Sequence, residues 1–120
     1  MTADCIFCRI ISKENEAEIV YEDEEIVAFK DVCPAAPVHL LIIPRRHIPT
    51  LADLKAEDTM LMGRLLSVAN DLARAFNLDK SGYRVVINCG KEGGQLVYHL
   101  HLHLLGGKVL SPAIAEGRGV

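Results

Sequence analysis

The sequence predicts an α+β fold in which an antiparallel sheet of about five strands is covered on one face by one long helix, with a short helix at the N-terminus. Three observations lead to this prediction. Short runs of β-branched and aliphatic residues alternate with turn-forming residues, which is typical of antiparallel strands. One long segment, from about residue 56 to residue 78, repeats apolar residues at helical spacing. The chain has 120 residues, half of them hydrophobic, which suits a single domain with one core.

The elements follow in order along the chain. Residues 4–12 carry isoleucine and phenylalanine at the spacing of a short amphipathic helix. Two apolar runs with acidic residues between them predict a hairpin, and the prolines within residues 33–37 exclude a sheet interior there. The glycine-rich residues 90–95 predict a loop. The predicted strands are 18–23, 25–31, 38–44, 83–89 and 97–105.

The long helix has an apolar arc wider than one sheet contact requires. Arg64, Ser67 and Arg74 mark a narrow polar stripe, and apolar residues fill most of the remaining circumference. The helix is therefore expected either to be central in the monomer or to contact a second subunit with its other flank.

Composition and charge exclude several classes of function. The formal net charge is −3 with acids and bases interspersed, so no basic surface for nucleic acid or an anionic membrane is expected. The first residues do not resemble a secretory signal, and no stretch approaches the roughly 18 apolar residues of a membrane helix. We expect a cytoplasmic protein with a single domain over residues 1–120, its core at about 4–107 and a C-terminal tail at 108–120.

A histidine-rich segment, YHLHLHLLGG at residues 98–107, is the strongest functional signal and holds three of the chain's five histidines. Residues two apart in a strand share a face, so His99, His101 and His103 are expected on one side and the intervening leucines in the core. Two chemistries stay open: a zinc site with three histidine ligands, or a histidine nucleophile oriented by its neighbours. The preceding glycine loop, whose backbone N–H groups can face an anion, favours a phosphate beside a nucleophile.

The residues from His99 to Leu105 resemble the His-φ-His-φ-His-φ-φ signature of the histidine triad nucleotide-binding family, φ being apolar. The resemblance covers about residues 4–107 and includes DCIFCRIISKE, YEDEEIVAFKDVCPAAPVHLLIIPRRHI and NCGKEGGQ. The short chain and Gly106-Gly107 resemble the Hint branch, which hydrolyses nucleoside phosphoramidates, more than the branch that cleaves dinucleoside polyphosphates. The resemblance implies a HIT-like fold, a purine nucleoside phosphoramidase acting on AMP or GMP conjugates, and a homodimer.

The resemblance also implies a role for each matching residue. His101 would attack the α-phosphorus and form a nucleotidyl-imidazole intermediate that water hydrolyses. His103 would contact the phosphate and help to protonate the departing amine, and His39 would support the triad from across the site. Asp31 would accept hydrogen bonds from the ribose hydroxyls. The phosphate oxygens would be held by Asn88 and the backbone from Gln95 to Val97. The purine would lie between Ile6, Phe7, Ile10, Phe29, Val32 and Leu41.

A second constellation begins with Cys5 and Cys8, whose C-x-x-C spacing in a chain without a secretory signal indicates metal or redox chemistry. The resemblance implies that His47 and His99 complete a Cys₂His₂ set that binds zinc. Four protein ligands would leave no open position for water, so such a zinc would be structural. A reduced pair without metal and a disulfide remain the alternatives.

One residue departs from the family pattern and keeps competing hypotheses open. The Hint branch usually has a serine directly after GGQ, near the scissile P–N bond, whereas this chain has Leu96. A slower phosphoramidase is expected. The alternatives are a nucleotide-binding regulatory module with little turnover, a dinucleoside polyphosphate hydrolase, and a zinc hydrolase that uses the three triad histidines as ligands.

Overall fold

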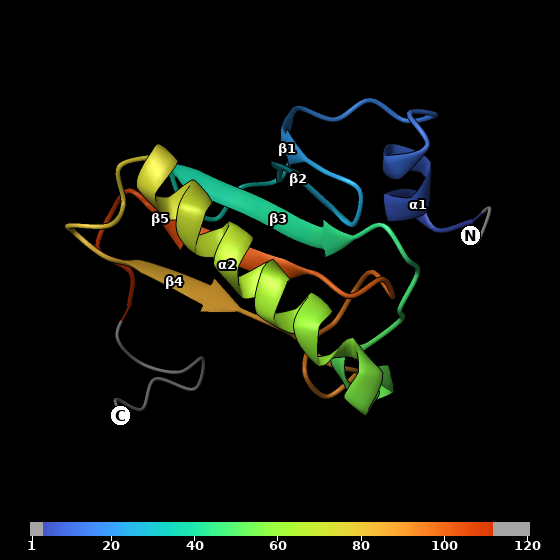
Figure 1. The fold of residues 1–120 in the computed structure, drawn as a ribbon. Helices are drawn as coiled ribbons and strands as arrows, with labels where there is room; N and C mark the ends of the chain where they lie inside the picture. The colour runs from blue at the N-terminus through green and yellow to red at the C-terminus, as the bar shows by residue number, and fades with distance from the viewer. Residues whose placement is uncertain (1–3, 112–120) are drawn as a thin grey trace.

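The structure, a computed structural model, describes residues 4–111, and in that range two α-helices pack on one five-stranded sheet (Figure 1). The strand order is β1-β2-β3-β5-β4, and each neighbouring pair is antiparallel. The elements are α1 (Ile6–Ile11), β1 (Ile19–Glu22), β2 (Ile26–Lys30), β3 (Val38–Pro44), two 3₁₀ turns (Leu51–Asp53 and Ala56–Asp58), α2 (Thr59–Ala75), β4 (Tyr83–Val86) and β5 (Leu102–Gly106). The predicted α+β architecture is confirmed.

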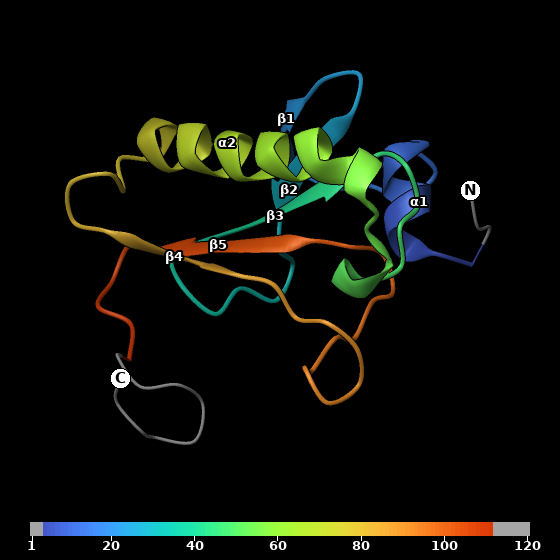
Figure 2. The same cartoon turned by 60° about the horizontal axis from the view of Figure 1, so that its bottom comes forward.

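Helix α2 lies along one face of the sheet, over β3 and β5 (Figure 2). Its inward side chains pack against the alternate strand residues that point toward the helix. This first core contains Ile26, Ala28, Leu40, Ile42, Ile48, Leu65, Val68, Ala69, Leu72, Ala73, Leu78, Leu100, Leu102 and Leu104. The leucines between the triad histidines are therefore core residues, as expected.

The end of α2 is set by its sequence. Asn77 adopts a left-handed conformation with φ of 62°, which ends the helix. The Leu78 backbone N–H donates to the Ala73 carbonyl at 2.8 Å, and the Asn77 N–H donates to the Arg74 carbonyl at 3.0 Å. This pair of bonds is a Schellman motif, and it directs the chain back toward β4.

The opposite face of the sheet is covered as well, which corrects the expectation that only one face is buried. Helix α1 lays Phe7 and Ile10 on this face, and a second cluster forms there. Its strand members are Val27, Phe29, Leu41 and Ile43. Successive residues of β3 point to opposite faces, and both sets are buried because each face meets a helix.

The last strand is shorter than predicted and begins at Leu102, not at residue 97. The final pair between β3 and β5 joins Ile42 to Leu102. Before that point the chain is held by a loop: the Leu100 N–H donates to the Ile48 carbonyl at 2.7 Å. His99 Nε2 lies 2.7 Å from the Pro44 carbonyl oxygen. These bonds replace the strand ladder, so His99 and His101 precede the strand and only His103 belongs to it.

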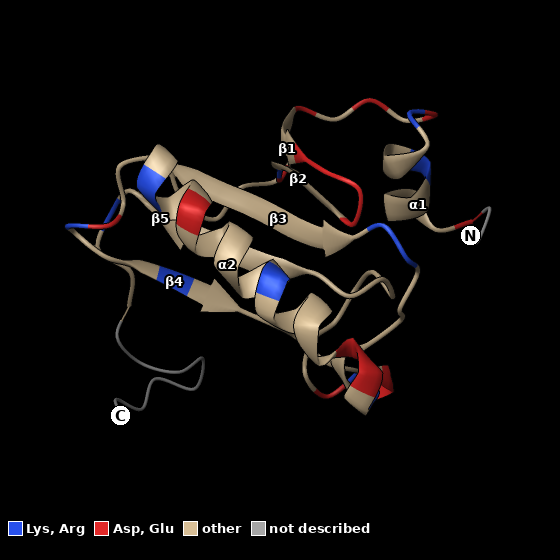
Figure 3. Ribbon diagram, viewed as in Figure 1, with Lys and Arg blue, Asp and Glu red and all other residues tan. Residues whose placement is uncertain are grey.

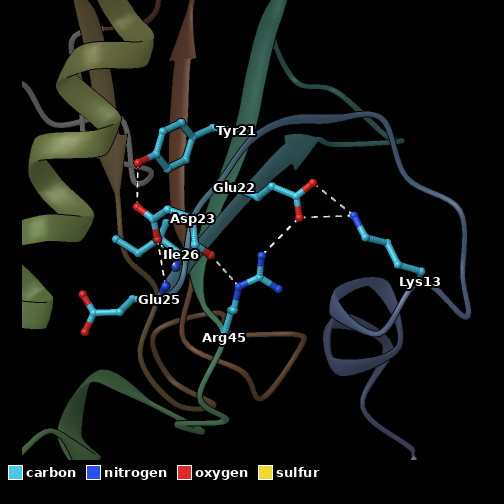
Figure 4. Close-up of polar contacts among 7 residues, drawn as sticks. All are labelled: Lys13, Tyr21, Glu22, Asp23, Glu25, Ile26 and Arg45. Carbon is cyan, nitrogen blue, oxygen red and sulfur yellow. Dashed lines mark hydrogen bonds and ion pairs between the residues drawn. The ribbon is translucent and has the colours of Figure 1, made fainter.

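The turn between β1 and β2 is fixed by Asp23 (Figure 4). The backbone N–H groups of Glu25 and Ile26 donate to its Oδ1, each at 2.8 Å, and the Tyr21 hydroxyl donates to its Oδ2 at 2.6 Å. Arg45, just after β3, donates from Nε to the Asp23 carbonyl at 2.6 Å. The outer hairpin is thereby tied to the central strand. Within residues 4–111 no helix is long and apolar enough to cross a membrane.

Candidate active site and metal centre

A pocket of about 360 Å³ opens on the sheet face that α1 covers. Part of its floor is one lateral row of the sheet, in which Phe29, Leu41 and His103 are register partners on β2, β3 and β5. Most of the predicted nucleotide-binding residues line it: Ile6, Phe7, Ile10, Phe29, Asp31, Val32, Leu41, Asn88 and Val97. His101 and His103 line it too, so it joins an apolar cleft to two triad histidines.

His101 is buried, and its surroundings define its tautomer. Its Nδ1 lies 2.7 Å from the His99 carbonyl oxygen, which can only accept, so Nδ1 carries the proton. A neutral imidazole has one N–H, and the lone pair is therefore on Nε2. Burial lowers the pKa of His101, which keeps the ring neutral at pH 7. The Phe7 ring packs edge-on against it, with 5.1 Å between ring centroids.

His39 and His103 form a hydrogen-bonded chain. The Ala35 backbone N–H donates to His39 Nδ1 at 2.9 Å, so the His39 proton is on Nε2. His39 Nε2 lies 2.9 Å from His103 Nδ1 and donates to it. The proton of His103 is then on Nε2. Burial, followed by the neighbouring histidines, lowers the pKa of His103 to about 4, so this ring is also neutral at pH 7.

The polar residues around the triad have defined local partners. The Cys33 N–H donates to Asp31 Oδ1 at 2.8 Å, and Asp31 Oδ2 lies 3.4 Å from His39 Nε2. Asn88 Nδ2 donates to the Gly93 carbonyl at 2.8 Å. This bond braces the glycine loop, in which Gly94 needs a positive φ of 80°.

Gln95 holds the glycine loop in place and is not among the residues that line the pocket. Its Oε1 accepts from the Gly90 N–H at 2.8 Å, and its Nε2 donates to the carbonyls of Pro49 at 2.7 Å and Val97 at 3.0 Å. The buried amide thus uses both ends of its side chain on the backbone. His39 is likewise absent from the pocket lining, and it contacts His103, which does line the pocket.

A second cluster gathers Cys5, Cys8, His47 and His99, whose ligand atoms all lie within 4.8 Å of one another. Cys5 Sγ is 3.5 Å and Cys8 Sγ 3.6 Å from His99 Nδ1. His47 Nδ1 is 3.3 Å from Cys8 Sγ and 3.2 Å from His99 Nδ1. Ligands of a tetrahedral zinc with ordinary Zn–S and Zn–N bonds are about 3.3–3.8 Å apart, so this spacing fits zinc.

The donor chemistry of this cluster also fits a metal. His99 Nε2 donates to the Pro44 carbonyl at 2.7 Å, which leaves the lone pair of Nδ1 facing the cysteines. Burial lowers the pKa of His99 to about 4, so the ring is neutral as a ligand must be. Burial raises the pKa of the Cys5 thiol, so a cation is needed to hold it as thiolate at neutral pH.

A second group of three residues, Asp31, His39 and His103, lies close enough to suggest a metal but does not fit one. His39 Nε2 and His103 Nδ1 are 2.9 Å apart, closer than the about 3.3 Å between two nitrogens on one zinc. The Ala35 N–H also leaves a proton on His39 Nε2. The hypothesis of a zinc hydrolase with three triad ligands is wrong, because the ring of His99 faces the cysteines while His103 pairs with His39.

The pocket includes residues that sequence reasoning did not name. They are Asn15, Glu16, Ala17, Lys30 and Gly94. Residues 15–17 fall in the connection between α1 and β1, where no periodic pattern marks a function. Gly94 belongs to the predicted loop, and its positive φ could have been expected from the glycine pair in that loop.

The fold and the triad define the class of protein. Residues 4–116 match the family described as scavenger mRNA decapping enzyme C-term binding. Together with HIT family structures of the same fold, this match shows that the chain belongs to the histidine triad family. The resemblance stated from the sequence is confirmed.

Individual relatives are similar along nearly the whole chain. The purine nucleoside phosphoramidase of Escherichia coli strain K12 is 44% identical over 116 residues, which cover 97% of this chain and 98% of that protein. A HIT family hydrolase from Clostridium thermocellum superposes with a TM-score of 0.92 at 42% identity, covering 95% of this chain and 99% of the other. A zinc-bound histidine triad family protein from Mycobacterium smegmatis has a TM-score of 0.77 at 34% identity, covering 88% and 76%.

Proposed function

We propose that this protein hydrolyses purine nucleoside 5′-phosphoramidates through a covalent nucleotidyl–His101 intermediate. The observation that carries the proposal is the tautomer of His101, whose lone pair is on Nε2 in a ring that lines the pocket. The similarity to the Escherichia coli phosphoramidase supports the choice of substrate class.

The bound nucleotide would lie along the pocket floor. Its purine fits the apolar end, where Phe29 and Leu41 form the floor and α1 the wall. Its α-phosphate would lie at the other end, between His101 and the glycine loop. Asp31 also lines the pocket, with its Oδ2 3.4 Å from His39 Nε2, and would accept hydrogen bonds from the ribose hydroxyls.

Two displacements at phosphorus would complete the reaction. In the first, His101 Nε2 forms a bond to the α-phosphorus and the P–N bond breaks. The electron pair of that bond stays on the amine nitrogen, which takes a proton from water. In the second, a water oxygen attacks phosphorus, the bond to Nε2 breaks and its electron pair returns to the imidazole. The surplus proton of that water returns to solvent, so one water is consumed.

His103 would act in this scheme as a hydrogen-bond donor. Its pKa of about 4 makes it a poor reservoir of a second proton at neutral pH. Its Nε2–H can instead stabilise charge that develops on a phosphoryl oxygen or on the departing nitrogen. The Ala35–His39 chain would hold that N–H in place, which makes His39 a positioning residue.

We further propose that Cys5, Cys8, His47 and His99 bind a structural zinc ion, supported by the spacing of their ligand atoms. When bound, the metal would supply a fixed link between α1 and the segment before β5. Thiolate ligands require a reducing compartment, which is in keeping with a cytoplasmic protein. A homodimer is proposed as well, because part of α2 remains apolar and exposed.

The test is hydrolysis of adenosine 5′-phosphoramidate by the wild type and by H101A, both assayed without a chelator. We expect turnover in the wild type and a loss of at least about 1,000-fold in H101A, because the nucleophile is gone. Intact-mass analysis of wild type quenched in alkali, where a bond between phosphorus and an imidazole nitrogen survives, should detect one added nucleotidyl group, absent from H101A. Equal rates in both proteins would overturn the covalent mechanism. H101A should keep its melting temperature within a few degrees.

Leu96 favours a second candidate, a nucleotide-binding module with little turnover. This side chain lines the pocket and is 92% exposed, and it offers no hydroxyl to a leaving group. Calorimetric binding of AMP or GMP without hydrolysis of any phosphoramidate would favour the module over the enzyme.

A further inference from the structure

Glu16 is an exposed acidic residue that lines the pocket near the β1 edge of the sheet, away from the histidines of the triad. The lateral row of the sheet runs from His103 through Leu41 and Phe29 to Ile19 of β1. Adjacent strands are about 4.8 Å apart, so β1 is roughly 14 Å from β5. Glu16 lies just before β1 and still lines the pocket. A nucleotide with its phosphorus at His101 would therefore extend its base toward Glu16.

This carboxylate is available to a ligand. Among residues 4–111, the side chain of Glu16 has no hydrogen bond or ion pair, whereas its neighbour Glu18 pairs with Lys30 at 2.8 Å. The amide of Asn15, also in the pocket wall, is likewise without a side-chain hydrogen bond to any described residue. The pocket wall next to the expected position of the base thus offers the carboxylate of Glu16, which accepts hydrogen bonds, and the side-chain amide of Asn15, which can donate or accept them.

The charge of this region supports a base here and not a phosphate. The connection between α1 and β1 carries Glu14, Glu16 and Glu18, and Figure 3 shows acidic residues along it. The two nearby cations are already paired, Lys13 with Glu22 and the pocket residue Lys30 with Glu18. Like charges disfavour a phosphate at this end, whereas the glycine loop at the other end offers backbone N–H groups. The orientation of the nucleotide follows from this asymmetry.

We propose that Glu16 makes the pocket selective for guanine over adenine. The inference rests on the proposed function and deepens it. Guanine presents two adjacent donors on its Watson–Crick edge, N1–H and the N2 amine, which match the two acceptor oxygens of a carboxylate. Adenine presents one donor and a lone pair on N1, and that lone pair would face a carboxylate oxygen. The amide of Asn15 can donate to guanine O6.

The experiment compares guanosine and adenosine 5′-phosphoramidates as substrates, and GMP, IMP and AMP as ligands in calorimetry. Because Glu16 is solvent-exposed, we expect the wild type to favour guanosine by about fivefold in kcat/KM, mainly through KM. GMP should bind more tightly than IMP, which lacks the N2 amine, and IMP more tightly than AMP. E16Q should abolish or invert the preference, since glutamine offers one donor and one acceptor and so matches adenine.

The matched control is E14Q, which removes the same charge from a residue outside the pocket lining and should leave the guanine preference unchanged. Equal affinity for GMP and AMP in the wild type, or an unchanged preference in E16Q, would overturn the inference. A guanine preference in binding without turnover would support the inference while the proposed function fails. Absence of binding by all three nucleotides would overturn both.

Discussion

Each histidine of the triad has a different set of partners, so three identical side chains lie in three different environments. The ring of His99 faces the cysteines. The ring of His101 is oriented by a hydrogen bond to the His99 carbonyl, and the ring of His103 by a hydrogen bond from His39. The sequence predicts which residues are involved, because alternating histidines beside a glycine loop are rare without function. It does not predict the tautomers, which are set by the carbonyls of Pro44 and His99 and by the Ala35 N–H. Nearly every residue carries the same backbone carbonyl and N–H groups, so the sequence does not show which of them contacts a histidine ring.

At the same scale, Leu96 should limit the rate of leaving-group departure. L96S adds a hydroxyl at the pocket, and one such hydrogen bond in a partly exposed site is worth about 1 kcal/mol, or roughly fivefold in rate. We expect kcat/KM for adenosine 5′-phosphoramidate to rise by that factor in steady-state assays. The control L96A removes the apolar side chain without adding a hydroxyl. An equal rise in L96A would show that bulk and not hydrogen bonding limits the wild type.

At the scale of elements, α1 joins the two sites. Cys5 and Cys8 flank its first turn, and Phe7 between them packs against His101. The periodic spacing in residues 4–12 predicts this helix, but not the sheet face on which it lies. The start of β5 was likewise not predicted, because alternation continues from residue 97 while the ladder stops at Leu102. Long-range hydrogen bonds and the cysteine cluster decide that boundary.

Loss of the proposed zinc ion should release α1 from the sheet. C8S removes one ligand, and we expect less than about a tenth of the wild-type zinc content by atomic absorption. Phe7 and Ile10 each contribute about 1.5–3 kcal/mol by burial, so detaching α1 should cost several kcal/mol of unfolding free energy in urea titrations. The control C33S changes an exposed cysteine outside the cluster and should leave zinc content and stability unchanged. Full zinc content in C8S would contradict the proposed ligand set.

For the molecule as a whole, the exposed part of α2 is the remaining unexplained feature. The buried residues of α2 pack on the sheet, yet two further apolar side chains of this helix stay exposed, Met60 at 82% and Leu66 at 46%. The sequence predicts this surplus, since its apolar arc is wider than one contact requires.

A second copy of the chain is the proposed occupant of that surface. Sedimentation equilibrium should give about 26 kDa, twice the 13.2 kDa of one chain. L66D should shift the protein toward the monomer, because a charge placed in an apolar interface is left without a partner. The control L96D alters an exposed leucine at the pocket, away from α2, and should remain dimeric. A concentration-independent mass of one chain in the wild type would contradict the dimer.

The cysteine cluster joins residues that are 94 positions apart, Cys5 and His99, and this bears on how the protein is made. A chain emerging from the ribosome exposes α1 early, and Phe7 can pack on Phe29 and Cys8 can contact His47 before the histidine segment is made. The contact between Phe7 and His101 and the fourth member of the cluster, His99, come only with that segment. The candidate active site and the cysteine cluster are therefore both completed late in synthesis, by the same segment of the chain.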